Sequence, residues 1–387
     1  MVSEKHTIPP LVLDDGWTLN SIERSLQHVI ASAGAPLQLS KDFVGRRKGA
    51  MHDAARLQLL ATWARLAQER RLLYHSANLV PSVLDELCTY APGIAALRLC
   101  EGVSVGEQFI RRRDALEPAA DKMAWSDQLQ WGRIIKGRTI DFTCVSGSKV
   151  QYLSSLFTAR NAHAVKRKEG MFRVLSALSE YVAKSDAVLI PQSFIKACAV
   201  FASELIKNTQ EHATSDHRNQ PYLEHAEGLI FSWQQMPEKS YRQDFEGHPR
   251  LLEFWDREHV PVRGGESKAL RCLQISFFDT GPGFASRASG KSVDDLSATD
   301  ERKALFDCLQ KNASTKREAG SGNGLPDVLE ALREIGGLMN IRSGRLHVFN
   351  AFTPSENRDL FDFDDWSPRP LAPATGAVVS LLIPIRR

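Results

Sequence analysis

The chain has 387 residues, of which 43% are hydrophobic and 25% charged, and its formal net charge is +3. This composition is ordinary for a globular protein and excludes a wholly disordered or collagen-like chain, while the length predicts two domains. A net charge this small does not predict nucleic acid as a partner.

Residues 1–185 alternate helical and strand-like segments and contain no recognisable chemical motif. Apolar residues recur at helical spacing from Leu57 to Arg71, and Leu72–Tyr74 can begin a short strand. We therefore predict an N-terminal α/β domain over residues 1–185, with a role that the sequence does not define. It is the natural place for an unknown protein partner to bind.

Residues 190–387 have a different pattern, in which long apolar segments alternate with Gly-rich turns. Helices are predicted at 194–213, 300–309 and 326–335, and strands at 228–233, 273–278, 338–342, 346–352 and 377–385. The polar segment 234–268 reads as an insertion or a long hairpin. This mixed order predicts an α/β sandwich, with a mixed, mostly antiparallel sheet and helices on one face.

The first motif of this C-terminal region lies within the predicted helix, in the segment Glu204–Ala213. Glu204, Asn208 and His212 are four residues apart, so they share one helix face. The amide oxygen of Asn208 can coordinate Mg²⁺, and Glu204 can take a proton from an attacking water. The alternative is an exposed polar stripe on an amphipathic helix.

The second motif, Phe277–Gly283, follows an apolar strand directly. Gly281 and Gly283 allow a sharp turn, which leaves the Asp279 carboxylate facing a cavity. Such a carboxylate can accept a hydrogen bond from an exocyclic amine such as that of adenine. The alternative is a simple turn capped by an aspartate.

The third motif is the Gly-rich segment Ser314–Leu325, which precedes the predicted helix at 326–335. Its glycines allow backbone N–H groups to approach a phosphate, and the helix N-terminus adds partial positive charge. Thr315 and Lys316 can supply a hydroxyl and an ammonium group to the same anion. The alternative is a flexible loop without a ligand.

Two other phosphate-binding patterns fit less well. Residues 285–292 resemble a loosened P-loop, but the preceding strand ends too early and no apolar helix follows. The Gly-rich segment 320–324 does not follow a strand within a parallel βαβ unit, as a dinucleotide fingerprint requires.

Together the three motifs resemble the GHKL superfamily of ATP-binding domains, which includes gyrase, the ninety-kilodalton heat-shock chaperone, MutL and sensor histidine kinases. Glu204–Asn208 is similar to the family's N box, Asp279–Gly283 to its D-x-G-x-G box, and Gly320–Leu325 to its second glycine box. Ser314–Lys316 resembles the entry to the family's lid, and Gly376–Pro384 its closing strand. The resemblance covers residues 190–387 and implies a Bergerat-type fold.

Carried over residue by residue, the resemblance implies an ATP site with Mg²⁺. Asn208 is expected to bind the metal, Asp279 to bind the adenine amine, and Glu204 to act as the general base. The remaining nucleotide-binding candidates are His212, Gly281, Gly283, Thr315, Lys316, Gly320, Gly322, Asn323, Gly324 and Leu325. Ala377 departs from the family pattern, because many kinase members carry Thr at this position.

The resemblance leaves the reaction open. We expect an Mg-dependent ATPase that couples nucleotide binding and hydrolysis to a regulatory conformational change. The alternatives are a protein kinase of the histidine or anti-sigma serine type and a non-hydrolysing, nucleotide-gated interaction module. By family analogy, the protein could act as a homodimer.

The sequence also predicts a cytoplasmic protein. No stretch approaches the roughly 20 apolar residues that span a bilayer, so no membrane partner is expected. The six cysteines are widely spaced and form neither a C-x-x-C pair nor a Cys/His cluster. This spacing indicates buried thiols in a reducing compartment.

Overall fold

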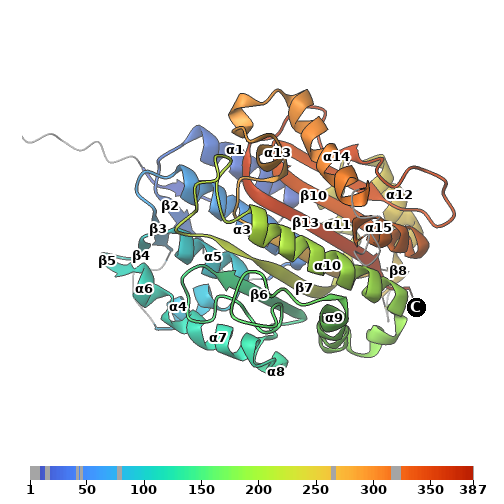
Figure 1. The fold of residues 1–387 in the computed structure, drawn as a ribbon, viewed down its shortest axis with the longest axis horizontal. Helices are drawn as coiled ribbons and strands as arrows, with labels where there is room; N and C mark the ends of the chain where they lie inside the picture. Colours follow the sequence, from blue (N-terminus) through green and yellow to red (C-terminus); the bar gives the residue numbers. More distant parts are fainter. Residues whose placement is uncertain are drawn as a thin grey trace, which may run out of the picture.

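The computed structural model describes residues 9–13, 18–40, 43, 47–75, 81–262, 267–314 and 324–386. Within them the chain forms a five-stranded and an eight-stranded β-sheet surrounded by helices (Figure 1). The strands are β1 (Leu11–Val12), β2 (Leu37–Leu39), β3 (Arg71–Tyr74), β4 (Gly102–Val105), β5 (Gln108–Arg111), β6 (Thr139–Val145), β7 (Ala226–Pro237), β8 (Val260–Pro261), β9 (Lys268–Asp279), β10 (Leu338–Gly344), β11 (Leu346–Ala351), β12 (Asp364–Asp365) and β13 (Ala374–Pro384).

The helices include one long segment, α10, and several short connections. They are α1 (Leu19–Ala31), α3 (Ala50–Leu66), α4 (Pro81–Cys88), α5 (Ala91–Leu99), α6 (Arg112–Ala115), α7 (Glu117–Asp127), α8 (Trp131–Ile134), α9 (Lys168–Ala183), α10 (Gln192–His212), α11 (Glu238–Phe245), α12 (Pro249–Glu258), α13 (Phe284–Ser289), α14 (Ala298–Ser314) and α15 (Gly324–Ile335), with 3₁₀ turns η1 (Lys184–Leu189) and η2 (Val293–Asp295). Among the described residues, no helix combines the length and apolar character needed to cross a membrane.

The large sheet has the strand order β12-β11-β10-β13-β9-β7-β6, with β8 paired to β9 beside this path. Every neighbouring pair is antiparallel. In the small sheet, β1 to β4 are parallel and β5 is antiparallel to β4. The prediction of an α/β protein with mixed and antiparallel sheets is therefore confirmed.

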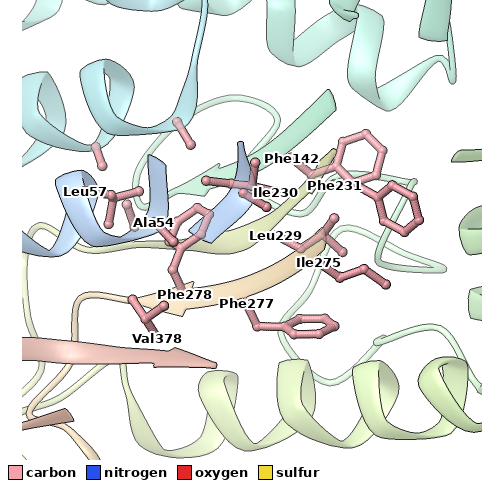
Figure 2. Packing of buried hydrophobic residues seen from close by; sticks show 14 of the residues in the cluster. Ala54, Leu57, Phe142, Leu229, Ile230, Phe231, Ile275, Phe277, Phe278 and Val378 are labelled. Atoms are coloured by element: carbon pink, nitrogen blue, oxygen red, sulfur yellow. The ribbon is translucent and has the colours of Figure 1, made fainter. Parts of the chain in front are cut away.

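Helices cover both faces of the large sheet, whereas the sequence predicts helices on one face only. On β9, the Phe277 ring packs edge-on against Phe201 of α10, with ring centroids 5.7 Å apart. The next residue, Phe278, points to the opposite face, toward Ala54 and Leu57 of α3 (Figure 2). Successive side chains on a strand point to opposite faces, so two apolar neighbours both become buried only when each face has a helical cover.

The N-terminal segment supplies part of this large sheet and its cover. Strand β6 is its edge strand and pairs with β7 from Thr139↔Ser232 to Val145↔Ala226. Helix α3 packs on β13, β9 and β7. The predicted division at residues 185–190 therefore does not separate the two sheets.

The segment predicted as an insertion or a long hairpin, residues 234–268, includes the end of β7, then α11, α12 and β8, and reaches the first residue of β9. Its side chains Tyr241, Phe254 and Trp255 are fully buried with Leu270 and Cys272 of β9 in a second apolar cluster. Although this segment is polar in composition, its helices are amphipathic, and their apolar sides cover the face of the sheet opposite α10.

Candidate functional site

An open cavity of about 500 Å³ lies between the C-terminal half of α10, the end of β9 and α13. Its walls bring together Asn208 and His212 of the first motif with Asp279 and Gly283 of the second. Cavities that bind small molecules typically measure roughly 300–1,000 Å³. The structure thus places four of the predicted site residues around one space of suitable size.

Asp279 forms the acidic part of this cavity, at the last position of β9. It lies opposite Ala377 on β13 and opposite Glu227 on β7. The Gly281 N–H donates to its Oδ1 at 2.9 Å. Burial raises the pKa of Asp279 to about 6, although the Gly281 and Ala377 N–H groups act in the opposite direction. At neutral pH the group is a largely ionised acceptor in a poorly solvated position.

Gly281 and Gly283 allow the turn after Asp279 to approach its neighbours very closely. A Cβ atom at position 281 would lie 2.7 Å from the Cα, Cβ and O atoms of Ala213, just past the end of α10. Gly283 has a φ of +85°, and a Cβ atom there would lie 2.7 Å from Ser343 Oγ. Gly281 therefore allows the turn to approach the end of α10, and Gly283 allows it to approach β10.

Glu204 does not line the 500 Å³ cavity. It borders a neighbouring cavity of about 30 Å³ that it shares with Asn208 and Leu325. Its Oε2 accepts a hydrogen bond from the Gly324 N–H at 3.1 Å, so the carboxylate caps the N-terminus of α15. Leu325 is buried and contributes to packing at this junction.

Five predicted residues of the third motif lie outside the described residues. They are Thr315, Lys316, Gly320, Gly322 and Asn323. The described end of this motif, Gly324, opens α15 directly beside Glu204. The first and third motifs therefore meet at this point, one helical turn from Asn208.

Arg287 is a cavity residue that the sequence reasoning missed. It lies on α13, and its guanidinium donates to Asn219 Oδ1 at 2.8 Å and lies 3.0 Å from His212 Nδ1. Residues 285–292 resemble a loosened P-loop in sequence, but most of them form the helix α13, which ends at Gly290 in the left-handed conformation. The spacing of Arg287, one helical turn after Gly283, was the signal that could have identified it.

The buried carboxyl group of Glu227 lies beside the half-buried Asp279, and the sequence did not identify it. Gln210 Nε2 donates to its Oε1 at 3.0 Å, and its Oε2 lies 3.7 Å from His225 Nε2. Burial raises the pKa of Glu227 to about 8 and lowers that of His225 to about 4, so both are largely neutral at pH 7. Only one of the two neighbouring acids, Asp279, is mainly charged at this pH.

Among the described residues, no group of three or more His, Cys, Asp or Glu side chains could hold a metal ion. Five of the six cysteines are buried, as the sequence predicts, and Cys308 is half-buried. Comparison with models of known protein families, with curated proteins and with solved structures finds no match to this chain.

Proposed function

We propose that this protein binds ATP with Mg²⁺ in the 500 Å³ cavity and couples hydrolysis of ATP to a conformational change. The observation that carries the proposal is the pairing of two unlike groups around one cavity. Asp279 offers a half-buried, poorly solvated anionic acceptor, and Arg287 offers a cation. A purine nucleotide with an exocyclic amine and a phosphate tail has the complementary chemistry.

The base is held by Asp279 in this proposal. A poorly solvated carboxylate favours binding of a ligand that brings an N–H donor, because leaving this acceptor without a hydrogen bond costs free energy. Gly281 donates to Oδ1 at 2.9 Å, which orients the carboxylate before the ligand arrives. Adenine supplies the required amine, whereas hypoxanthine presents a carbonyl oxygen at the same ring position.

The donor set fits Mg²⁺ bound mainly through phosphate. Mg²⁺ usually keeps several waters and takes one or two protein oxygens together with substrate phosphates, so a preformed carboxylate cage is not required. Asn208 lines both the large and the small cavity and would supply the protein oxygen. When bound, the metal neutralises negative charge on the phosphates.

Glu204 would act as the general base once its carboxylate is released from the Gly324 N–H. Its carboxylate holds the Gly324 N–H at 3.1 Å, and the N-terminus of a helix is also a favourable position for phosphate. A phosphate group that takes over this N–H would free the carboxylate to orient a water and remove its proton. Nucleotide binding and activation of the base would then be coupled.

The same contact favours a second candidate, a nucleotide-gated module that does not hydrolyse ATP. If Glu204 stays bound to Gly324, the site holds nucleotide but lacks a base. Both candidates agree with the resemblance of the three motifs to GHKL domains, and the two differ in turnover.

The test is a calorimetric titration of the full chain with ATP and ADP, with and without Mg²⁺, followed by a phosphate-release assay. We expect binding by the wild type, and unchanged binding with loss of turnover in Glu204→Gln. Glu211→Gln is the matched control, because Glu211 lies on the same helix, does not line either cavity, and forms only distant ion pairs, at 3.7 Å with Lys207 and 4.0 Å with His212. Absence of nucleotide binding would refute the proposal, and binding without phosphate release would favour the gated module.

A further inference from the structure

We propose, on the basis of the proposed nucleotide site, that Arg287 is a phosphate-binding residue that exchanges its present protein partners for the anionic tail of the nucleotide. None of the three sequence motifs contains this residue. The inference concerns the part of the ligand that Asp279 does not bind.

The guanidinium of Arg287 lies in the wall of the cavity and reaches across it. Helix α13 places the side chain opposite the last turn of α10, where Nη2 lies 3.0 Å from His212 Nδ1. Nη1 donates to Asn219 Oδ1 at 2.8 Å. Longer contacts, each of 3.5 Å, reach Ser215 Oγ and the Glu211 carbonyl oxygen.

None of these partners is a carboxylate. Within the described part of the chain, Arg287 forms no ion pair with a carboxylate, whereas many arginines of this protein do, for example Arg345 with Glu301 and Arg386 with Glu258. The nearest acidic side chain on α10, Glu211, is engaged with Lys207 at 3.7 Å and lies 4.0 Å from His212 Nε2. The cavity therefore contains an arginine whose charge no described carboxylate balances.

An anion is the ligand that this arrangement favours. A guanidinium presents several N–H donors in a rigid plane that matches phosphate oxygens, and charge-assisted bonds are stronger than those to amide or imidazole acceptors. The present partners lie near solvent, because the contacts to Asn219 and His212 are exposed. When Arg287 leaves these partners, water can hydrogen-bond to them at little cost in free energy. Transfer of the guanidinium from these partners to a phosphate group is therefore favourable.

The test compares adenosine with ADP, because the two ligands share the base and differ in charge. We expect Arg287→Ala to weaken ADP binding by about 10-fold or more, the magnitude typical of a hydrogen bond to a charged group. Adenosine binding should stay within about twofold of the wild type. Arg287→Lys should retain part of the ADP affinity, because the charge remains and the planar fork is lost.

Lys291→Ala is the matched control, since it removes one exposed positive charge from the same segment without touching the cavity lining. It should leave both affinities unchanged. Equal weakening of adenosine and ADP by Arg287→Ala would show that Arg287 only maintains the cavity, and unchanged ADP affinity would remove it from the site. Either result overturns this inference about Arg287, but nucleotide binding itself would still be shown by the titration of the wild type. Failure of the wild type to bind either ligand would instead overturn the proposed function.

Discussion

Replacing Asp279 by Asn should weaken adenine nucleotide binding and at the same time stabilise the free protein. Most substitutions at buried positions weaken both properties, so opposite signs would separate a binding role from a structural one. The expectation follows from two facts about this side chain. It is half-buried with a raised pKa, and it lies at the cavity wall.

The effect on stability follows from the difference between the unfolded and the folded pKa. The pKa of Asp279 rises from 3.8 to about 6 on folding, so the ionised form is disfavoured in the folded state by roughly 3 kcal/mol. This cost is absent below pH 3.8 and fully present above about pH 6. Asn can still accept from Gly281 but satisfies Ala377 less well, which offsets about 1 kcal/mol. We expect a net gain of about 1–2 kcal/mol at pH 7, fading as the pH falls toward 4.

The effect on binding has the opposite sign. Loss of a hydrogen bond to a charged acceptor should weaken ATP and adenosine by about 10- to 100-fold. The amide of Asn can donate to a carbonyl oxygen, so the variant should lose its preference for ATP over inosine triphosphate. A protein that only lost its fold would show no such change in preference.

Urea unfolding at pH 4, 5, 6 and 7 measures the first effect, and calorimetric titration with ATP and inosine triphosphate measures the second. The reasoning is refuted if Asp279→Asn binds ATP as tightly as the wild type. A variant less stable than the wild type at pH 7 would also refute the expectation, because ionisation of Asp279 would then not destabilise the folded protein.

Further predictions concern the residues around Asp279. Glu227→Gln keeps the acceptor for Gln210 and should stabilise the protein by on the order of 3 kcal/mol. The raised pKa of Glu227 makes its ionisation costly in the folded state, so the gain in the free energy of unfolding, measured in urea, should grow between pH 4.5 and 8. A gain independent of pH would contradict this. Gly281→Ala should destabilise the protein by about 1–3 kcal/mol and weaken nucleotide binding, because the new Cβ atom would lie 2.7 Å from atoms of Ala213. Gly132→Ala serves as the control, because a Cβ atom at position 132 has no neighbour within 4 Å. ATP affinity, measured by titration, should fall about tenfold per pH unit below pH 6 as Asp279 takes up a proton, and a flat profile would exclude its carboxylate from binding.

Local patterns were sufficient to predict much of the C-terminal half of the chain. The predicted helix 194–213 corresponds to α10 (Gln192–His212), and the strand predicted to end at 278 is β9, which ends at Asp279. Periodicity and turn residues act over a few positions, so they are visible without the fold. They also identified Asn208 and Asp279, which the structure places at one cavity.

Local sequence patterns did not predict the contacts between segments that are distant in the chain. Helix α3 is buried almost all round, so its apolar residues have no single face, and its predicted extent of 57–71 differs from the observed Ala50–Leu66. Strand β6 joins the large sheet across more than eighty residues of sequence, and no local signal specifies that partner. Helix α3 and the segment that contains α11 and α12 cover the second face of the sheet, and the local sequence pattern assigned neither of them to it.

Within the candidate site, the sequence by itself determined which side chains could carry the chemistry, because residue type and spacing set what a helix face or a strand end presents. Only the tertiary structure decided how they are used. It engages Glu204 with Gly324, brings Arg287 to the wall opposite α10, and sets Glu227 beside Asp279. The pKa of a group and the partner of a charge depend on burial and on neighbours distant in the chain, and folding alone creates these.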